Sequence, residues 1–295
     1  MNEIKKVIVP VAGLGTRFLP LSKVLPKELF PLVDKPVLQY IVEEAVASGI
    51  EEIIFVTRPD KKEVVDYFEK YFRESSKLNE ILKKRQKNEL LEGLNGIEKM
   101  AEKIKFSQAS QEEPLGDGHA ILQAKNQTQG EAVAIMWGDD VVESKIPCLL
   151  QLIRVFQKYQ KPVIALCRIP KERLPYYGVV EGQEIQKGIY KIKRLVEKPK
   201  IEEAPSNLAV VGKYILTPKV FEYLAKAKPG KGEEIYLSEN LQKMINDGEE
   251  ILGCEIKGKW LECGNKTEWL KSHLYLTLKD PEFGPQLKEA LKEYL

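Results

Sequence analysis

A short glycine-containing stretch near the N-terminus holds the residues best suited to bind a phosphate chain. Residues 7–11 are an apolar run typical of a buried strand, and Gly13 and Gly15 follow it directly. Arg17 and Lys27 come next, in a loop punctuated by prolines. Glycines let backbone N–H groups approach an anion closely, and Arg and Lys neutralise its charge. The pattern therefore predicts a loop that binds a nucleoside triphosphate.

A second group of chemically capable residues follows another apolar run. Residues 134–138 predict a strand, and Asp139 and Asp140 stand at its C-terminal end. Open α/β sheets place their ligands at the carboxyl ends of their strands. Mg²⁺ prefers carboxylate and phosphate oxygens and keeps several waters, so one or two protein carboxylates are enough to hold it. These residues are therefore candidates for a Mg²⁺ site.

Two better-known phosphate motifs are incomplete in this chain. The run from Gly13 through Gly15 to Phe18 lacks the third glycine of a dinucleotide fingerprint, and no acidic residue of the NAD type follows the second predicted strand. Residues 253–259 imitate a P-loop, but Trp260 occupies the position of the Ser or Thr that binds Mg²⁺. A dehydrogenase and a P-loop enzyme are both disfavoured.

The opening loop also carries a resemblance to a known family. Residues 11–36 read VAGLGTRFLPLSKVLPKELFPLVDKP and contain G-x-G-T-R-x-x-P followed by P-K. This pattern resembles that of the sugar-nucleotide pyrophosphorylases, which are nucleotidyltransferases. The resemblance extends in five ordered blocks from residue 6 to about residue 284. Ala12 and the continuation PKELFPLVDKP are similar to the uridylyl-transferring branch, which implies UTP and glucose 1-phosphate as substrates.

The resemblance implies roles for the residues of the opening loop. The backbone of two small residues would lie against the base, the next three residues would hold the phosphates, and a lysine would steady the reacting phosphate. Ala12 and Gly13 are the residues assigned to the base, and Gly15, Thr16 and Arg17 are those assigned to the phosphates. Lys27 is the lysine assigned to the reacting phosphate.

The resemblance also places the base pocket and the metal. A glutamine amide can pair with N3–H and O4 of uracil together, which assigns Gln108 as the base reader, with Gly116 and Gly118 closing the pocket. Asp117 departs from the family, which often has leucine there. Asp139 is implied as a nucleotide-side Mg²⁺ ligand, and Glu262 as the second ligand. Aspartate is the usual occupant at the position of Glu262, and glutamate reaches one methylene further.

On the sugar side, the resemblance assigns Glu197 to the hexose hydroxyls and Lys198 to the sugar phosphate. Gly178 leaves room for the ring, and Gly212 belongs to a further matching block. Glu197 and Lys198 alternate along a predicted strand, so both side chains face one ligand only if the strand bends there. Pro199 makes such a bend plausible.

The implied reaction is Mg²⁺-assisted nucleotidyl transfer. An oxygen of the sugar phosphate attacks the α-phosphate in line, and pyrophosphate leaves. Positioning and charge stabilisation are the protein's work, and Arg17, Lys27 and Lys198 are its catalytic residues. Three alternatives stay open: a thymidylyltransferase, a uridylyltransferase for another hexose 1-phosphate, and a catalytically silent regulatory relative. Glu262 and the altered segment 114–118 are the only support for the last.

These residues need a framework that places them at one sheet edge. Strand and helix patterns alternate in the first half, which predicts an α/β fold. We expect three Rossmann-like layers around a mixed, mainly parallel sheet, with a small antiparallel extension on the sugar side. The expected organisation is a single nucleotidyltransferase domain, 1–295, with a helical insertion at 60–103 that Gly93 and Gly96 interrupt. A sugar-binding subdomain is expected at about 170–216.

Composition limits the remaining function classes. The 295 residues are 43% hydrophobic and 31% charged, with 46 Lys and Arg against 44 Asp and Glu. No basic face for nucleic acid is indicated. No apolar run approaches the ~20 residues of a membrane span, and the N-terminus lacks a signal sequence, so a cytoplasmic location without membrane partners is expected. Four scattered cysteines do not form a zinc pattern. The family resemblance implies a homotetramer or homodimer.

Overall fold

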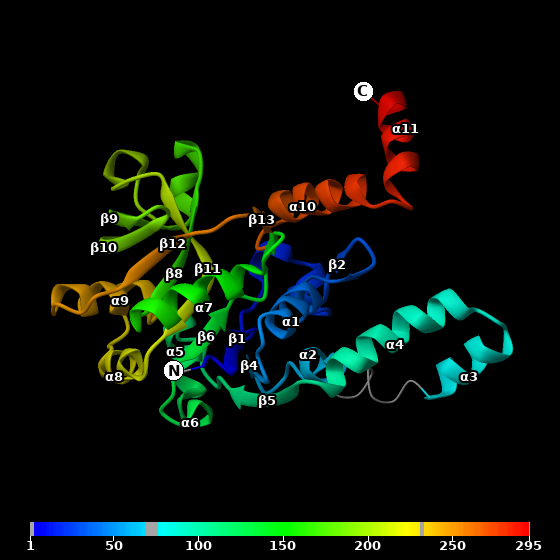
Figure 1. The fold of residues 1–295 in the computed structure, drawn as a ribbon, viewed down its shortest axis with the longest axis horizontal. Coiled ribbons are helices and arrows are strands. Elements are labelled where there is room, and N and C mark those ends of the chain that lie inside the picture. The colour runs from blue at the N-terminus through cyan, green and yellow to red at the C-terminus, as the bar shows by residue number, and fades with distance from the viewer. Residues whose placement is uncertain (1–2, 69–75, 231–232, 295) are drawn as a thin grey trace.

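A nine-stranded sheet forms the centre of the molecule (Figure 1). The computed structural model describes residues 3–68, 76–230 and 233–294. The strand order is β5-β4-β1-β6-β11-β8-β12-β10-β9. The strands are β1 (Lys6–Pro10), β4 (Glu52–Thr57), β5 (Lys105–Ser110), β6 (Val133–Met136), β8 (Val163–Arg168), β9 (Gly178–Gln186), β10 (Ile189–Glu197), β11 (Leu208–Leu216) and β12 (Leu252–Glu255).

The two halves of this sheet are built differently. β5, β4, β1 and β6 are parallel neighbours, as the alternating strand and helix patterns predict. In the other half, β11 runs antiparallel to both β6 and β8, and β9 and β10 form an antiparallel hairpin. Only β8 and β12 are parallel there. The prediction of a mainly parallel sheet is therefore wrong beyond β6. There β11 runs antiparallel to both of its neighbours, and the hairpin of β9 and β10 pairs with β12 through β10, again antiparallel.

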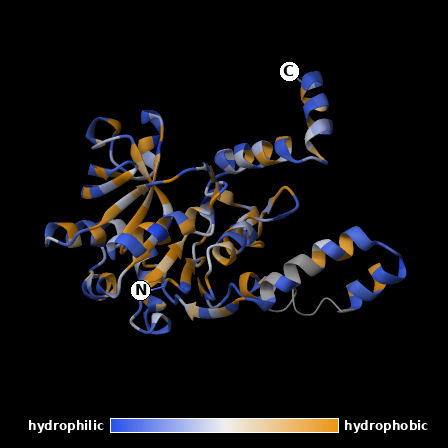
Figure 2. Cartoon of the chain, viewed as in Figure 1, coloured by the Kyte–Doolittle hydropathy of each residue, from blue (hydrophilic) through white to orange (hydrophobic). Residues whose placement is uncertain are grey.

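Helices cover both faces of the sheet, which gives the three expected layers. Alternate strand residues point to opposite faces. Val7 and Val9 pack in one core with α1 (Val37–Ala47) and α7 (Cys148–Tyr159). Ile8 points into the other core, which α5 (Asp117–Gln123), α8 (Pro218–Lys226) and α9 (Leu237–Asn246) cover. Hydrophobic residues accordingly concentrate on the central strands (Figure 2).

Two small sheets and several further helices complete the chain. β2 (Pro31–Leu32) pairs with β3 (Lys35–Pro36), and β7 (Asp140–Glu143) pairs with β13 (Lys259–Glu262). β12 and β13 are separated by only three residues, yet they belong to two different sheets. The short helix α6 (Lys125–Thr128) follows α5, while α10 (Lys266–Lys279) and α11 (Gly284–Tyr294) extend away from the central sheet (Figure 1).

The helical insertion follows β4. It contains α2 (Glu63–Asp66), α3 (Ser76–Lys84) and α4 (Asn88–Glu102), and α3 and α4 project from the body as an arm (Figure 1). α4 runs through Gly93 and Gly96 without a break, so the prediction that these glycines interrupt it is wrong. A glycine costs an exposed helix only about 1 kcal/mol, which its helix-forming neighbours can offset. No helix in the described ranges is both long and apolar enough to cross a membrane.

Candidate functional site

Two cavities meet at the carboxyl ends of β1 and β6. One has a volume of about 500 Å³ and contains the opening glycine loop. The other, of about 190 Å³, opens on the antiparallel half of the sheet. Asp117, Trp137 and Asp139 line both cavities. A ligand that occupies both must therefore pass the Asp139 carboxylate.

The larger cavity presents mainly backbone and small residues. The loop after β1 forms one wall, and the segment that leads into α5 forms another. Gly118, which the resemblance also assigns to the base pocket, does not line this cavity. The lining includes the catalytic candidate Lys27 and six of the predicted nucleotide-binding residues, namely Ala12, Gly13, Gly15, Thr16, Gly116 and Asp139.

The glutamine of this cavity is Gln111, not Gln108. Gln108 lies on β5 with an exposed side chain, and its amide donates to the Thr57 hydroxyl. Gln111 lies just beyond β5, is only 4% exposed and lines the cavity. Its amide nitrogen donates to the Gly116 carbonyl at 3.0 Å. Gln108 therefore does not line the larger cavity, because the chain turns toward the cavity only after the strand ends.

The loop 114–118 is fixed by the segment before α9. The N–H of Ile235 donates to Leu115 O at 2.7 Å, and the N–H of Gly118 donates to Ile235 O at 2.8 Å. Gly116 has φ +95°, and a Cβ there would lie 2.8 Å from Ile235 O. Asp117 completes the connection by accepting the N–H of Leu237 at 2.9 Å. Only glycine at position 116 permits this close packing.

An ion pair stands where the two cavities meet. Lys27, at the start of a short 3₁₀ helix, donates to the Asp139 carboxylate. Burial disfavours the charged form of both residues, but the attraction between the two opposite charges is stronger than this effect. The pKa of Lys27 is accordingly raised and that of Asp139 lowered. Both groups are therefore charged at neutral pH and ready to meet phosphate or metal.

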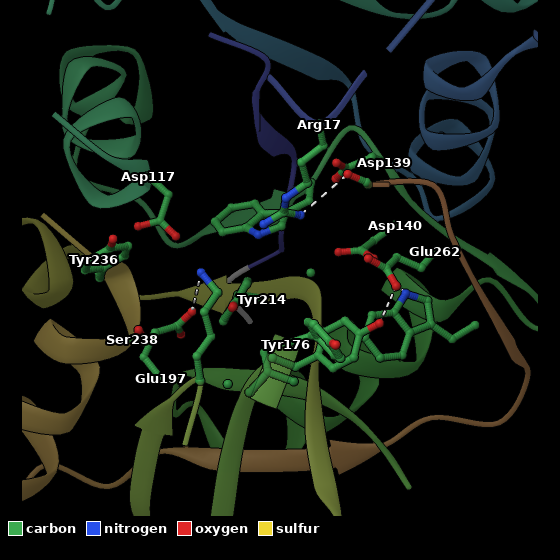
Figure 3. Close-up of a pocket in the computed structure, with 18 residues that line it drawn as sticks. Arg17, Asp117, Asp139, Asp140, Tyr176, Glu197, Tyr214, Tyr236, Ser238 and Glu262 are labelled. Atoms are coloured by element: carbon green, nitrogen blue, oxygen red, sulfur yellow. Dashed lines mark hydrogen bonds and ion pairs between the residues drawn. The ribbon is translucent and has the colours of Figure 1, made fainter. Parts of the chain in front are cut away.

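The smaller cavity presents mainly charged and aromatic side chains (Figure 3). Lys198 has φ +44°, which breaks the alternation of β10, so Glu197 and Lys198 both line the cavity. The Lys198 Nζ lies 3.4 Å from Glu197 Oε1. The predicted bend is therefore present, at Lys198 itself. Gly178 and Gly212 also line this cavity, as predicted for the sugar side.

Close contacts with neighbouring residues explain why position 212 is a glycine. A Cβ at this position would lie 2.2 Å from the Asp140 Oδ2 and 2.7 Å from the Trp137 ring. The Gly212 carbonyl also accepts the N–H of Trp137 at 2.7 Å. The absence of a side chain therefore lets the acidic strand end lie directly against β11.

A group of acidic residues forms the wall opposite Asp117 and Glu197 (Figure 3). Asp140 pairs with Glu262 across β7 and β13 and accepts a hydrogen bond from Trp260 Nε1 at 2.7 Å. Burial and the carboxylates of Asp139 and Glu262 raise the pKa of Asp140 to about 7. Burial also raises the pKa of Glu262, although the Tyr177 hydroxyl donates to its carboxylate. This wall therefore favours a cation.

The residues present fit a divalent metal. A Cβ on Gly264 would lie 3.1 Å from Asp139 Oδ2 and 3.4 Å from Glu262 Oε1, so two carboxylate oxygens converge on space that glycine leaves open. Carboxylates suit a hard cation such as Mg²⁺. Glu262 also lies 3.5 Å from Arg173 Nη2, which helps to orient it.

Arg17 differs from its expected position. Its side chain lines the smaller cavity, not the larger one, and Nη1 donates to Gly264 O at 3.5 Å. It therefore faces the smaller cavity and not the glycine loop. Motif reasoning also missed Gln111 and the cavity-lining Trp137, Tyr236 and Ser238. Trp137 could have been found, because it lies only two residues before Asp139 at the predicted strand end.

This arrangement of a mixed sheet with a phosphate loop and an acidic strand end is that of a nucleotidyltransferase. Residues 6–278 match the nucleotidyl transferase family, and the chain belongs to that family. Enzymes of this family commonly use a divalent metal.

Individual relatives are similar over nearly the whole chain. A UTP–glucose-1-phosphate uridylyltransferase of Staphylococcus epidermidis is 39% identical over 99% of both chains. The chain is also 39% identical, over 99% of both lengths, to a protein of Methanocaldococcus jannaschii named as a putative UTP–glucose-1-phosphate uridylyltransferase. A UDP-glucose pyrophosphorylase complexed with UDP-glucose superposes with a TM-score of 0.84 at 38% identity, over 94% of this chain and 100% of that one. The UTP-bound enzyme of Acinetobacter baumannii gives 0.86 at 33% identity, over 98% and 99%.

Proposed function

We propose that this protein forms UDP-glucose and pyrophosphate from UTP and glucose 1-phosphate. The observation that carries the proposal is the meeting of two chemically different cavities at Asp139. One suits a nucleoside triphosphate and the other a phosphorylated sugar, so the bond between them forms at their junction.

UTP occupies the larger cavity in this proposal. The uracil lies between the loop at Ala12 and Gly13 and the loop at Gly116, where Gln111 is placed to read its amide edge. Free N–H groups of the glycine loop hold the phosphates, and Lys27 meets the phosphate nearest Asp139. Backbone donors suit this task because they need no reorganisation when charge develops.

Glucose 1-phosphate occupies the smaller cavity. Glu197 accepts hydrogen bonds from sugar hydroxyls, while Lys198 and Arg17 hold the phosphate. A phosphate oxygen attacks the α-phosphorus of UTP, a new P–O bond forms, and the bond to the bridging oxygen of pyrophosphate breaks. A phosphate monoester is already anionic near pH 7, so the protein supplies alignment and positive charge instead of a general base.

Asp139 and Glu262 are the proposed Mg²⁺ ligands. When bound, Mg²⁺ stabilises negative charge on the phosphate oxygens. Lys27 holds the Asp139 carboxylate, and Tyr177 holds that of Glu262, so both ligands are already oriented.

Pyrophosphate release tests the proposed function. The reaction contains Mg²⁺ and glucose 1-phosphate, with UTP, dTTP, CTP, ATP or GTP offered separately. The proposal predicts a strong preference for UTP. Equal use of dTTP would instead indicate a thymidylyl-transferring or promiscuous enzyme, and no release with any nucleotide would contradict the proposal. Galactose 1-phosphate in place of glucose 1-phosphate tests the choice of hexose.

Assembly as a homodimer or homotetramer is part of the proposal. Large apolar side chains on and between α10 and α11 are exposed, which a second copy could cover. The proposal predicts a mass of two or four chains of 33.7 kDa by light scattering, and a single-chain mass would contradict it. The exposed residues are Leu270 (58%), Leu274 (42%), Phe283 (40%) and Tyr294 (79%).

A further inference from the structure

A buried lysine lies against the backbone carbonyl groups of the glycine loop. Lys61, between β4 and α2, is only 5% exposed. Its Nζ donates to the Val11 carbonyl and, at 2.7 Å, to the Glu28 carboxylate. It also lies 3.4 Å from the Gly13 carbonyl. A buried ammonium group is costly unless its donors are satisfied, and here two of its three acceptors belong to the loop.

A second cation, Arg58, contacts the Ala12 carbonyl, which lies between the Val11 and Gly13 carbonyls that Lys61 contacts. Arg58 Nη1 donates to Ala12 O at 3.4 Å, while its Nε is held by Asp60 at 2.9 Å. Three successive carbonyls of the loop, those of residues 11–13, therefore turn toward cations on the segment after β4.

The direction of these carbonyls sets the direction of the neighbouring amides. In a trans peptide the C=O of one residue and the N–H of the next point to opposite sides. Carbonyls held by Lys61 and Arg58 therefore turn the N–H groups of Ala12, Gly13 and Leu14 away from these cations. Within the described part of the chain, none of these three N–H groups donates to a protein acceptor. They are available to a ligand.

We infer that Lys61, assisted by Arg58, is a positioning residue that orients the peptide groups of the glycine loop for the nucleotide. Lys61 acts through the backbone and not as a long-range charge, because Glu28 is only 2% exposed and forms a close ion pair with it. The inference rests on the proposed placement of UTP in the larger cavity.

The consequence is a specific kinetic pattern. Loop amides contact the nucleotide before and during the reaction, so misaligned amides weaken binding in both states. Loss of such uniform binding raises KM for UTP with little change in kcat. The KM for glucose 1-phosphate stays unchanged, because its cavity does not contain the clamped peptides.

A neutral double variant provides the test. Lys61→Met alone leaves the Glu28 carboxylate buried without its partner, so Lys61→Met is combined with Glu28→Gln. We expect this variant to bind UTP roughly tenfold more weakly by calorimetry, since about 1.4 kcal/mol of orientation is lost. We also expect kcat to stay within about threefold and KM for glucose 1-phosphate within about twofold. Lys62→Met, which removes an exposed lysine one residue away, is the matched control.

Arg58→Met is a second variant that keeps the test decisive if the double variant does not fold. The side chain of Arg58 is only 24% exposed, and we expect a roughly threefold weaker UTP affinity from the loss of one long hydrogen bond. Unchanged UTP affinity in whichever of these variants is folded overturns the inference, as does an equal rise in KM for both substrates. Failure of the unmodified protein to bind UTP would instead contradict the proposed function itself.

Discussion

The two cavities of the site recognise their ligands by different means. The larger one presents glycine loops and backbone donors from a few short segments, whereas the smaller one presents side chains from segments that are far apart in the chain. Backbone recognition leaves a compact pattern of glycines in the sequence. Side-chain recognition is visible only after folding brings β10, β11 and β13 together.

Both cavities carry more carboxylates than cations, and the larger one has four carboxylates and one lysine in its lining. Five carboxylates and only two cations line the smaller cavity. A phosphorylated sugar cannot bind there without further positive charge, because like charges at close range repel strongly in a partly buried site. The excess of acid therefore supports a divalent metal at the junction. The carboxylates are those of Asp117, Asp139, Asp140, Glu197 and Glu262, and the cations are Arg17 and Lys198.

The largest effect is expected at Asp139, one of the three residues that line both cavities. Asp139→Asn removes a proposed Mg²⁺ ligand and the partner of Lys27, and we expect kcat to fall by about 10³-fold or more. Steady-state pyrophosphate release measures this. Chelation of divalent metal should abolish the activity of the unmodified enzyme, and added Mg²⁺ should restore it. Activity of the variant within tenfold of normal would remove Asp139 from the reaction.

Lys198 tests the smaller cavity by itself. Lys198→Ala should lower kcat by roughly 10²–10³-fold, because the positive charge beside the attacking phosphate is lost. UTP affinity by calorimetry should not change, since Lys198 does not line the larger cavity. A variant that also loses UTP affinity would contradict the division between the cavities.

Gln111 and Gln108 form a matched pair for the larger cavity. Gln111→Ala should raise KM for UTP roughly tenfold and reduce the preference for UTP over CTP, because the amide facing the base is lost. Gln108→Ala should stay within about twofold of the unmodified enzyme, since its side chain lies outside the cavity. The reverse result would place the base beside β5.

Asp117 connects the two cavities and gives the smallest expected effect. Burial, together with the nearby Glu197 carboxylate, raises its pKa to about 6. The folded state therefore binds this proton more tightly than the unfolded state. The ionised carboxylate lowers the free energy of unfolding by its full amount above pH 6, and this loss disappears below about pH 4, where Asp117 is protonated in both states.

Asp117→Asn should consequently raise the free energy of unfolding by about 1 kcal/mol at pH 8. This value is smaller than the one that corresponds to the whole pKa shift, because the partly exposed side chain is screened by solvent. The difference from the unmodified protein should vanish near pH 4. Denaturant unfolding at both pH values measures it, and a variant that is less stable at pH 8 would show that the carboxylate's bond to Leu237 N outweighs its burial.

Much of the parallel half could be predicted from the sequence. The apolar runs at residues 7–11 and 134–138 predicted β1 and β6 within about two residues, and the glycine pattern after β1 predicted that Gly13 and Gly15 would line a cavity. These signals are local: each depends on a periodicity or a turn within a few residues.

The rest depends on contacts that no local pattern contains. The reversed direction of β11 is set by its packing between β6 and β8. Gln108 and Gln111 are three residues apart, and only the end of β5 decides which one turns into the cavity. Lys61 falls at the start of the predicted helical insertion, but its ammonium group is buried against the carbonyl groups of the glycine loop.

The most direct test of the division between the two cavities is a crystal structure of the protein with UDP-glucose. We expect the uracil beside Gln111 and Gly116, the hexose beside Glu197, and the diphosphate beside Asp139. A uracil beside Gln108, or a hexose outside the cavity of Glu197 and Lys198, would contradict this division of the site.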